Sequence, residues 1–195
     1  MKTRYLDSSE IRALKKATAA SDWLPFEVAL YTGLRIGDVL KIKRADISSD
    51  GILTFTAQKT GKTGQIKLPK QLTNKLTANN SSQWVFPSPR KGSAFHLTRQ
   101  AAWARIKASA RRAHIDIDGC SPHSLRKVFA VDLFKREGSK AVMDALQHSD
   151  MNTTDIYALS DFISGENANL PLLRGDLHFI IQFVAERVLA RISKK

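Results

Sequence analysis

The spacing of hydrophobic residues switches from a helical period to a period of two and back, and this switch constrains the fold most. Between Ile52 and Leu68, "ILTFTAQ" and "QIKLP" alternate apolar with polar residues, and the "KTGKTG" between them carries Gly61 and Gly64. Alternating segments joined by a glycine-bearing turn are typical of a β-hairpin. The pattern predicts a hairpin with a basic loop within a chain of helices, which is a mainly helical α+β fold.

Helical spacing dominates on both sides of the hairpin. Asp7 or Ser8 can cap a first helix that has Glu10 in its first turn. A second helix is expected from about Pro25 to the "TGLR" turn, and a short third one through Leu40. Further helices are expected over residues 69–78, 98–114, 124–138, 139–146 and 176–192, whereas residues 84–92 are expected to form an extended segment followed by a turn.

The composition fits one folded domain, or one domain with a small appendage. Hydrophobic residues make up 43% of the 195 residues, which is enough for a packed core. No apolar run of membrane-spanning length occurs, and "MKTRYLDSSE" at the N-terminus lacks the apolar stretch of a secretory signal, so we expect a cytoplasmic protein with no membrane partner. Cys120 stands alone, which excludes an internal disulfide, and we expect a buried or unreactive thiol.

The charge balance points to a polyanionic partner. Lys and Arg number 31 against 18 Asp and Glu, which gives a net charge of +13 and a pI near 10.1. Such an excess favours nucleic acid or an anionic membrane. The helix expected over residues 98–114 has five basic side chains with no acidic residue among them, and both DNA contact and a solvated basic face remain open for it: Arg99, Arg105, Lys107, Arg111 and Arg112.

Two familiar kinds of site are excluded. "GKT" at 61–63 resembles the end of a phosphate-binding loop, but that motif needs glycine where Thr56 stands, and the segment leads into a strand instead of a helix. The five histidines are scattered, without an H-E-x-x-H pattern or a neighbouring carboxylate cluster. We therefore expect neither a metal nor another cofactor.

"PHSLRK" places an imidazole beside a guanidinium. His123 and Arg126 are three residues apart at the start of a helix, so their side chains project from neighbouring positions on one face. A purely structural role is the alternative, with Arg126 paired to an acid and His123 capping the helix.

Four segments taken in order resemble the catalytic domain of the tyrosine recombinases, the phage-integrase family. They are "YTGLRIGDVL", "QKTGKTGQIKLP", "SPHSLRKVF" and "LQHSDMNTTDIYAL", and the resemblance covers about residues 7–160. It implies the catalytic-domain fold of that family, with a small antiparallel β-sheet or hairpin at one edge. Gln147 stands where family members commonly have Gly, and Asp38 where they commonly have Glu.

The resemblance implies six catalytic residues: Arg35, Lys59, His123, Arg126, His148 and Tyr157. Tyr157 is the implied nucleophile, which stays attached to the DNA phosphate and so keeps the energy of the broken bond. Arg35 and Arg126 are the implied phosphate clamp, since guanidinium groups stay charged and match two phosphate oxygens. Lys59 suits the general acid for the departing 5′ oxygen, with Lys62 as the alternative. The two histidines would hydrogen-bond the phosphate or carry the nucleophile's proton.

The expected partner is double-stranded DNA, contacted by a wider set of basic residues: Lys62, Arg99, Arg105, Lys107, Arg111, Arg112 and Lys127. The implied activity is site-specific DNA recombination through a 3′-phosphotyrosine intermediate, without metal. A type IB topoisomerase and a non-catalytic DNA-binding protein are the alternatives. The family also implies a tetramer on DNA, with accessory DNA-bending proteins as further partners.

The expected organisation is a catalytic domain over residues 1–170 and a linker with an amphipathic helix over 171–195. That helix could pack on a neighbouring subunit or on its own domain. Arg35 leaves 34 residues before it, too few for the N-terminal DNA-binding domain of most family members, so we expect that domain to be absent. Of the other tyrosines, Tyr31 is expected in the core and Tyr5 near a frayed end.

Overall fold

The structure is a computed structural model, and it describes residues 3–78, 82–90 and 92–146. The predicted second histidine His148, the predicted nucleophile Tyr157 and the helix expected over residues 176–192 lie outside the described residues.

The chain starts with three helices, as the hydrophobic spacing predicted. They are α1 (Ser8–Lys16), α2 (Ala20–Thr32) and the short α3 (Ile36–Val39). The side chain of Asp7 accepts hydrogen bonds from the backbone N–H groups of Ser9 and Glu10, and the Glu10 side chain accepts one from Asp7 N. This reciprocal capping satisfies N–H groups that have no partner within the helix, so it fixes where α1 begins.

Helix α2 begins five residues before the expected start at Pro25. Proline cannot donate a backbone hydrogen bond and usually stands in the first turn of a helix. Here Asp22 N and Trp23 N both donate to Ala19 O, so the helix is already under way before the proline. Trp23 and Pro25 are buried, and this packing outweighs the missing hydrogen bond.

The predicted hairpin is present, and a second one follows it. Strands β1 (Ile52–Thr56) and β2 (Thr63–Lys67) pair antiparallel. The 3₁₀ turn η1 (Arg44–Asp46) precedes them, and α4 (Lys70–Thr77) follows close to its expected range. Residues 84–92 were expected to be extended and then turn, but β3 (Pro87–Ser88) also pairs with β4 (Gly92–His96), which the sequence did not predict. The reason is that β4 is largely exposed and starts Gly-Ser-Ala, which favours strands poorly.

Two long helices complete the described part of the chain. Helix α5 (Arg99–Arg112) begins after Thr98, whose side chain accepts a hydrogen bond from Ala101 N. Helix α6 (Pro122–Leu146) is interrupted at Gly138, whose φ is 80°. This break separates the two helices that were expected on either side of residue 138.

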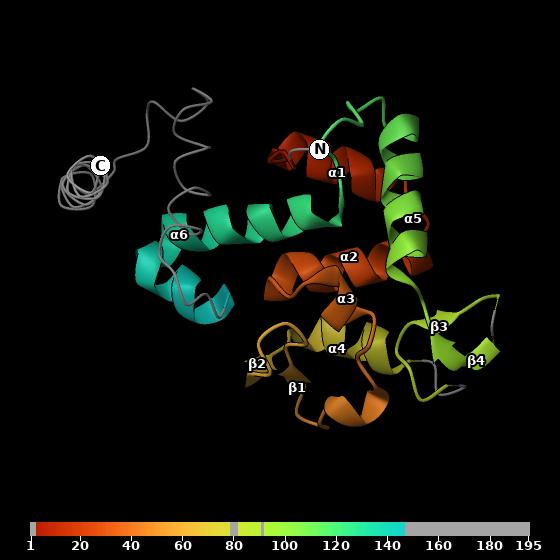
Figure 1. The fold of residues 1–195 in the computed structure, drawn as a ribbon, viewed down its shortest axis with the longest axis vertical. Helices are drawn as coiled ribbons and strands as arrows, with labels where there is room; N and C mark the ends of the chain where they lie inside the picture. Colours follow the sequence, from red (N-terminus) through yellow and green to blue (C-terminus); the bar gives the residue numbers. More distant parts are fainter. Residues whose placement is uncertain (1–2, 79–81, 91, 147–195) are drawn as a thin grey trace, which may run out of the picture.

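Helices α2 and α6 lie side by side across the middle of the molecule, and α5 stands across their ends (Figure 1). The β1–β2 hairpin and α4 lie on the opposite side of α2 from α6 in this view (Figure 1). The buried core joins these parts, with Phe26 from α2, Leu53 from β1, Ile106 from α5 and Leu125 from α6. Segments far apart in the sequence are therefore held together by one core.

Three smaller expectations can be compared with the structure. Cys120 is fully buried, as expected of a free thiol. Tyr31 was expected in the core, but it is 44% exposed. It lies in the last turn of α2 and faces outward, where its hydroxyl donates to Lys67 O on β2 over 3.3 Å. Among the described residues, none of the helices combines the length and hydrophobicity needed to cross a bilayer.

Candidate active site

Arg35 is positioned by a tight turn between α2 and α3. Helix α2 ends at Gly33, whose φ is 66°, a left-handed conformation that favours glycine. A Cβ at this position would lie 2.3 Å from Cδ1 of Phe129 on α6, so no larger residue fits without movement. Leu34 then enters the core and Arg35 takes the N-cap position of α3. The turn thus sets the direction of the Arg35 side chain.

Lys59 lies in the loop between β1 and β2, and this loop is fixed at several points. Its backbone closes on Ala57, because Thr60 N and Gly61 N both donate to Ala57 O over 3.2 and 2.8 Å. The buried carboxylate of Asp38 accepts a hydrogen bond from Gln58 N over 3.2 Å, which ties the loop to α3. Asp38 therefore couples the position of Lys59 to that of Arg35.

Arg126 is buried, with 3% of its surface exposed, and ties three segments together. Its guanidinium donates to Gly33 O at the end of α2 and, over 3.0 Å, to Leu146 O at the end of α6. His123 lies one turn earlier on α6 and is exposed. The two side chains therefore project from one helix start, as their spacing predicted.

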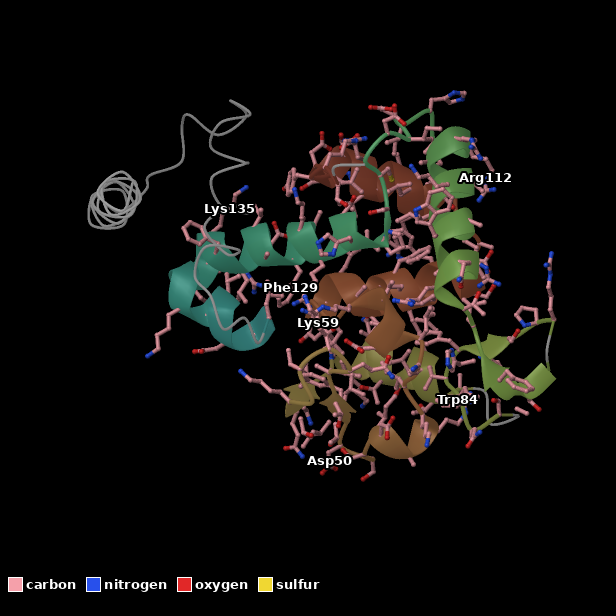
Figure 2. All side chains as sticks on the ribbon, in the orientation of Figure 1. Asp50, Lys59, Trp84, Arg112, Phe129 and Lys135 are labelled. Atoms are coloured by element: carbon pink, nitrogen blue, oxygen red, sulfur yellow. The ribbon has the colours of Figure 1, made fainter. Side chains whose placement is uncertain are left out.

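Four of the six predicted catalytic residues line one cavity of about 430 Å³: Arg35, Lys59, His123 and Arg126. They come from the α2–α3 turn, the β1–β2 loop and the start of α6. Lys59 lies near the centre of the molecule, where the hairpin loop faces the helices (Figure 2). The other two, His148 and Tyr157, lie outside the described residues.

The cavity holds a concentration of positive charge. The pKa of His123 is lowered, first by partial desolvation of its ring at the cavity wall and then by the charges of Arg126, Lys127 and Arg35. A neutral imidazole beside fixed cations can accept a proton. The arrangement can therefore neutralise a bound phosphate and take up a proton next to it.

Gln58 and Arg99 also line this cavity. Arg99 was predicted only as a DNA contact, and Gln58 was not singled out, although its place beside Lys59 was a signal for it. Within the described residues, no group of three or more His, Cys, Asp or Glu side chains could hold a metal ion.

Lys107 does not lie on a solvated basic face, which was one of the two alternatives left open for the basic residues of α5. It is 5% exposed, and its ammonium donates to Ile117 O in the loop before α6. The spacing of basic residues on α5 could not reveal this loop, which folds back over the helix.

Three more residues of the predicted DNA-binding set have protein partners. Arg105 forms an ion pair with Asp22 of α2 over 3.0 Å. Arg112 donates to Ala17 O over 2.9 Å, and Lys127 donates to Thr3 O over 2.8 Å. Lys62 and Arg111 are exposed. Arg105 was predicted as a DNA contact because α5 contains no acidic residue. Its acidic partner, Asp22, comes from α2 instead.

Comparison with known proteins identifies the family of this chain. The model of the phage integrase family matches residues 4–162. Tyrosine recombinase XerD of Vibrio vulnificus is 36% identical over 147 residues, which cover 67% of this chain and 46% of that protein. Tyrosine recombinase XerA of Thermococcus kodakarensis is 27% identical over 133 residues, covering 64% of this chain and 46% of the relative. The chain thus spans just under half the length of these relatives.

Solved structures share the fold. A lambda integrase dimer bound to a COC′ core site matches with a TM-score of 0.74 and 19% identity, covering 89% of this chain and 64% of that one. The lambda integrase catalytic core matches with a TM-score of 0.64 and 20% identity, covering 75% of this chain and 92% of that one. With the family model spanning most of the chain and the same fold in these structures, the protein belongs to the phage integrase family.

Proposed function

We propose that this chain cleaves and rejoins DNA strands as a site-specific recombinase, through a covalent 3′-phosphotyrosine intermediate on Tyr157. The observation that carries the proposal is the cavity in which Arg35, Lys59, His123 and Arg126 meet. Two arginines, one lysine and one imidazole suit a phosphodiester that must be held, neutralised and cleaved. Similarity to the XerD and lambda integrase proteins supports the same function.

The proposed reaction is a pair of transesterifications. The phenolic oxygen of Tyr157 attacks the scissile phosphorus, and the bond from phosphorus to the 5′ oxygen breaks. Lys59 gives a proton to that leaving oxygen, and the phenol's proton passes to a neutral imidazole, for which His123 and His148 are the candidates. Attack by a 5′ hydroxyl of another strand then releases the tyrosine and restores the phosphodiester.

Arg35 and Arg126 carry the charge of the transition state in this scheme. Guanidinium groups stay charged, and that of Arg126 is held by Gly33 O and Leu146 O before DNA binds, so little energy is spent on its reorganisation. Losing either is expected to cost about 3 kcal/mol of transition-state stabilisation. We expect no metal to be required, because these fixed cations can supply the charge neutralisation.

Trapping with a nicked suicide substrate tests the proposal. Such DNA loses its short 5′ fragment after cleavage, so rejoining stops and protein accumulates on the DNA. We expect an adduct with the natural chain, in EDTA as well as without it, and none with Tyr157→Phe. An equal yield from the Phe variant would refute the role of Tyr157, and loss of the adduct in EDTA would refute metal independence.

The proposed partners are double-stranded DNA and further copies of this chain. Structures with this fold include a lambda integrase tetramer bound to a Holliday junction. We propose residues 1–170 as the catalytic domain, acting in the cytoplasm on DNA, and residues 171–195 as an element that contacts a neighbouring subunit.

Size-exclusion chromatography on target DNA, with and without residues 171–195, tests this assembly. We expect the larger complexes to depend on that segment. Identical elution profiles of the two forms would contradict the exchange of this element between subunits.

A further inference from the structure

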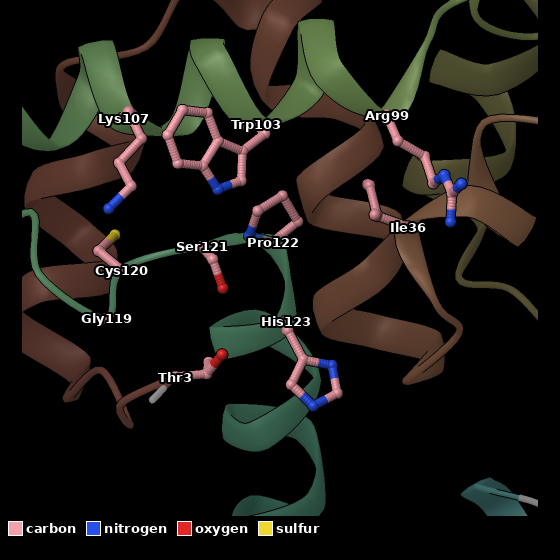
Figure 3. A pocket seen from close by; sticks show the side chains of 10 residues that line it. All are labelled: Thr3, Ile36, Arg99, Trp103, Lys107, Gly119, Cys120, Ser121, Pro122 and His123. Carbon is pink, nitrogen blue, oxygen red and sulfur yellow. The ribbon is translucent and has the colours of Figure 1, made fainter. Parts of the chain in front are cut away.

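A second cavity, of about 320 Å³, opens beside the one described above (Figure 3). The two share four lining residues: Ile36, Arg99, Pro122 and His123. The further wall of the second cavity includes Trp103 and Lys107 from α5 and Ser121 from the loop before α6. We call it the Trp103 cavity. Of its lining residues, the proposed chemistry uses His123 alone, which the two cavities share.

Lys107 brings a buried positive charge to the Trp103 cavity. Its ammonium has three N–H donors, and among the described residues Ile117 O is its hydrogen-bond acceptor. The ring of Trp103 lies 5.2 Å from Nζ and adds a cation–π contact. No carboxylate among the described residues forms an ion pair with it. A buried ammonium with unused donors is costly unless an anion completes its coordination.

Ser121 adds a buried polar group, its Oγ, without a hydrogen-bond partner among the described residues. Figure 3 shows this oxygen directed toward the side of the cavity where Thr3 and His123 lie. The ten lining residues include Lys107, Arg99 and His123 but no Asp or Glu. The unused donors and the charge both favour an anion.

We propose that the Trp103 cavity binds the DNA backbone phosphate adjacent to the scissile phosphate, with Lys107 and Ser121 as donors. This inference rests on the proposed function, which puts the scissile phosphate in the neighbouring cavity. Because His123 and Arg99 border both cavities, one DNA strand can occupy the two with consecutive phosphates. Trp103 is 49% exposed and offers its ring to the sugar between them. The second phosphate would fix the register of the strand in the active site.

Neutralising one phosphate at a time tests this site. A methylphosphonate replaces a charged oxygen by a methyl group, and can be placed at either neighbour of the scissile phosphate. We would measure the Kd of each duplex by fluorescence anisotropy for the natural chain, Lys107→Met and Ser121→Ala. Lys16→Met is the matched control, since Lys16 is exposed on α1 and lines neither cavity.

One of the two methylphosphonates should weaken binding of the natural chain about 10-fold, as expected for a charge-assisted hydrogen bond. Lys107→Met should weaken binding of unmodified DNA similarly, with no further loss on the modified duplex. Ser121→Ala should show the same coupling with a smaller loss, and it answers the question if Lys107→Met fails to fold. Lys16→Met should keep the full penalty.

Independent losses would overturn the proposal, because Lys107 and the phosphate would then act separately. The proposal would also fail if neither methylphosphonate changed the Kd of the natural chain for DNA. If inorganic phosphate then raised the Tm of the natural chain but not of Lys107→Met, the cavity would bind a free anion instead of DNA. Binding does not require cleavage, so these outcomes can be separated from the covalent trapping that tests the proposed function.

Discussion

At the scale of single residues, the proposed chemistry depends on how each cavity side chain is held. Arg126 is fixed by backbone carbonyls at two helix ends, whereas the side chain of Lys59 is exposed and only the backbone of its loop is held. This contrast suits a rigid clamp and a proton donor, respectively. The structure favours Lys59 over Lys62 as the proton donor. Of the two lysines, only Lys59 lines the cavity, and its neighbour Gln58 is hydrogen-bonded to Asp38.

Lys59→Ala should lower the rate of DNA cleavage by a factor of about 10² to 10⁴, the usual contribution of a general acid. A substrate with sulfur in place of the 5′ bridging oxygen should restore the rate, because a thiolate leaves without protonation. Single-turnover cleavage of both substrates measures this. Restoration by sulfur in Lys62→Ala instead would assign the proton to Lys62.

His123 predicts a pH effect on stability. Its pKa is lowered in the folded chain from the usual 6.5, so the unfolded chain binds more protons in the window just below that value. His123 therefore does not lower the free energy of unfolding above pH 6.5. As the pH falls from 6.5 through the folded pKa of His123, the free energy of unfolding decreases. Comparing Tm against pH for the natural chain and His123→Asn should show a shallower acid decline in the variant. Parallel curves would contradict it.

At the scale of elements, two tight approaches build the site. The α2–α3 turn needs Gly33 because α6 passes so close, and the loop before α6 is held by Arg4 N donating to Gly119 O and by Lys107 donating to Ile117 O. Both approaches join segments distant in sequence. Their geometry decides whether Arg35 and His123 face one cavity.

Gly33→Ala should lower the free energy of unfolding by more than about 1–2 kcal/mol, the cost of the left-handed backbone alone, since its Cβ also meets Phe129. Gly61→Ala is the matched control, with φ of 69° and no atom within 4 Å of the added Cβ, so it should show only the backbone cost. Urea denaturation measures both. Equal losses would mean that the Phe129 contact is unimportant.

The sequence predicted those features of the elements that depend on residues close together along the chain. The Asp7 cap and the β1–β2 alternation are interactions between near neighbours, so they were predictable. The early start of α2 depends on burial of Trp23, and the inward turn of Lys107 depends on a loop ten residues further on. Such features arise from packing against parts of the chain outside the helix itself, which residue spacing within the helix does not encode.

At the scale of the whole molecule, one core brings three short segments to a single cationic cavity. Order along the chain and family resemblance predicted which residues these would be, and the fold places Arg35, Lys59, His123 and Arg126 together. The positions of His148 and Tyr157 relative to them stay predictions. We expect a phosphate held in this cavity to become bonded to the phenol of Tyr157.

Mass spectrometry of the trapped protein–DNA adduct, after digestion of both components, tests for this bond. We expect a nucleotide linked through a 3′ phosphate to the peptide that contains Tyr157, with the yield greatly reduced in Arg35→Ala and Arg126→Ala. A nucleotide attached to Tyr31, Ser121 or any other residue, or an undiminished yield without both arginines, would contradict it.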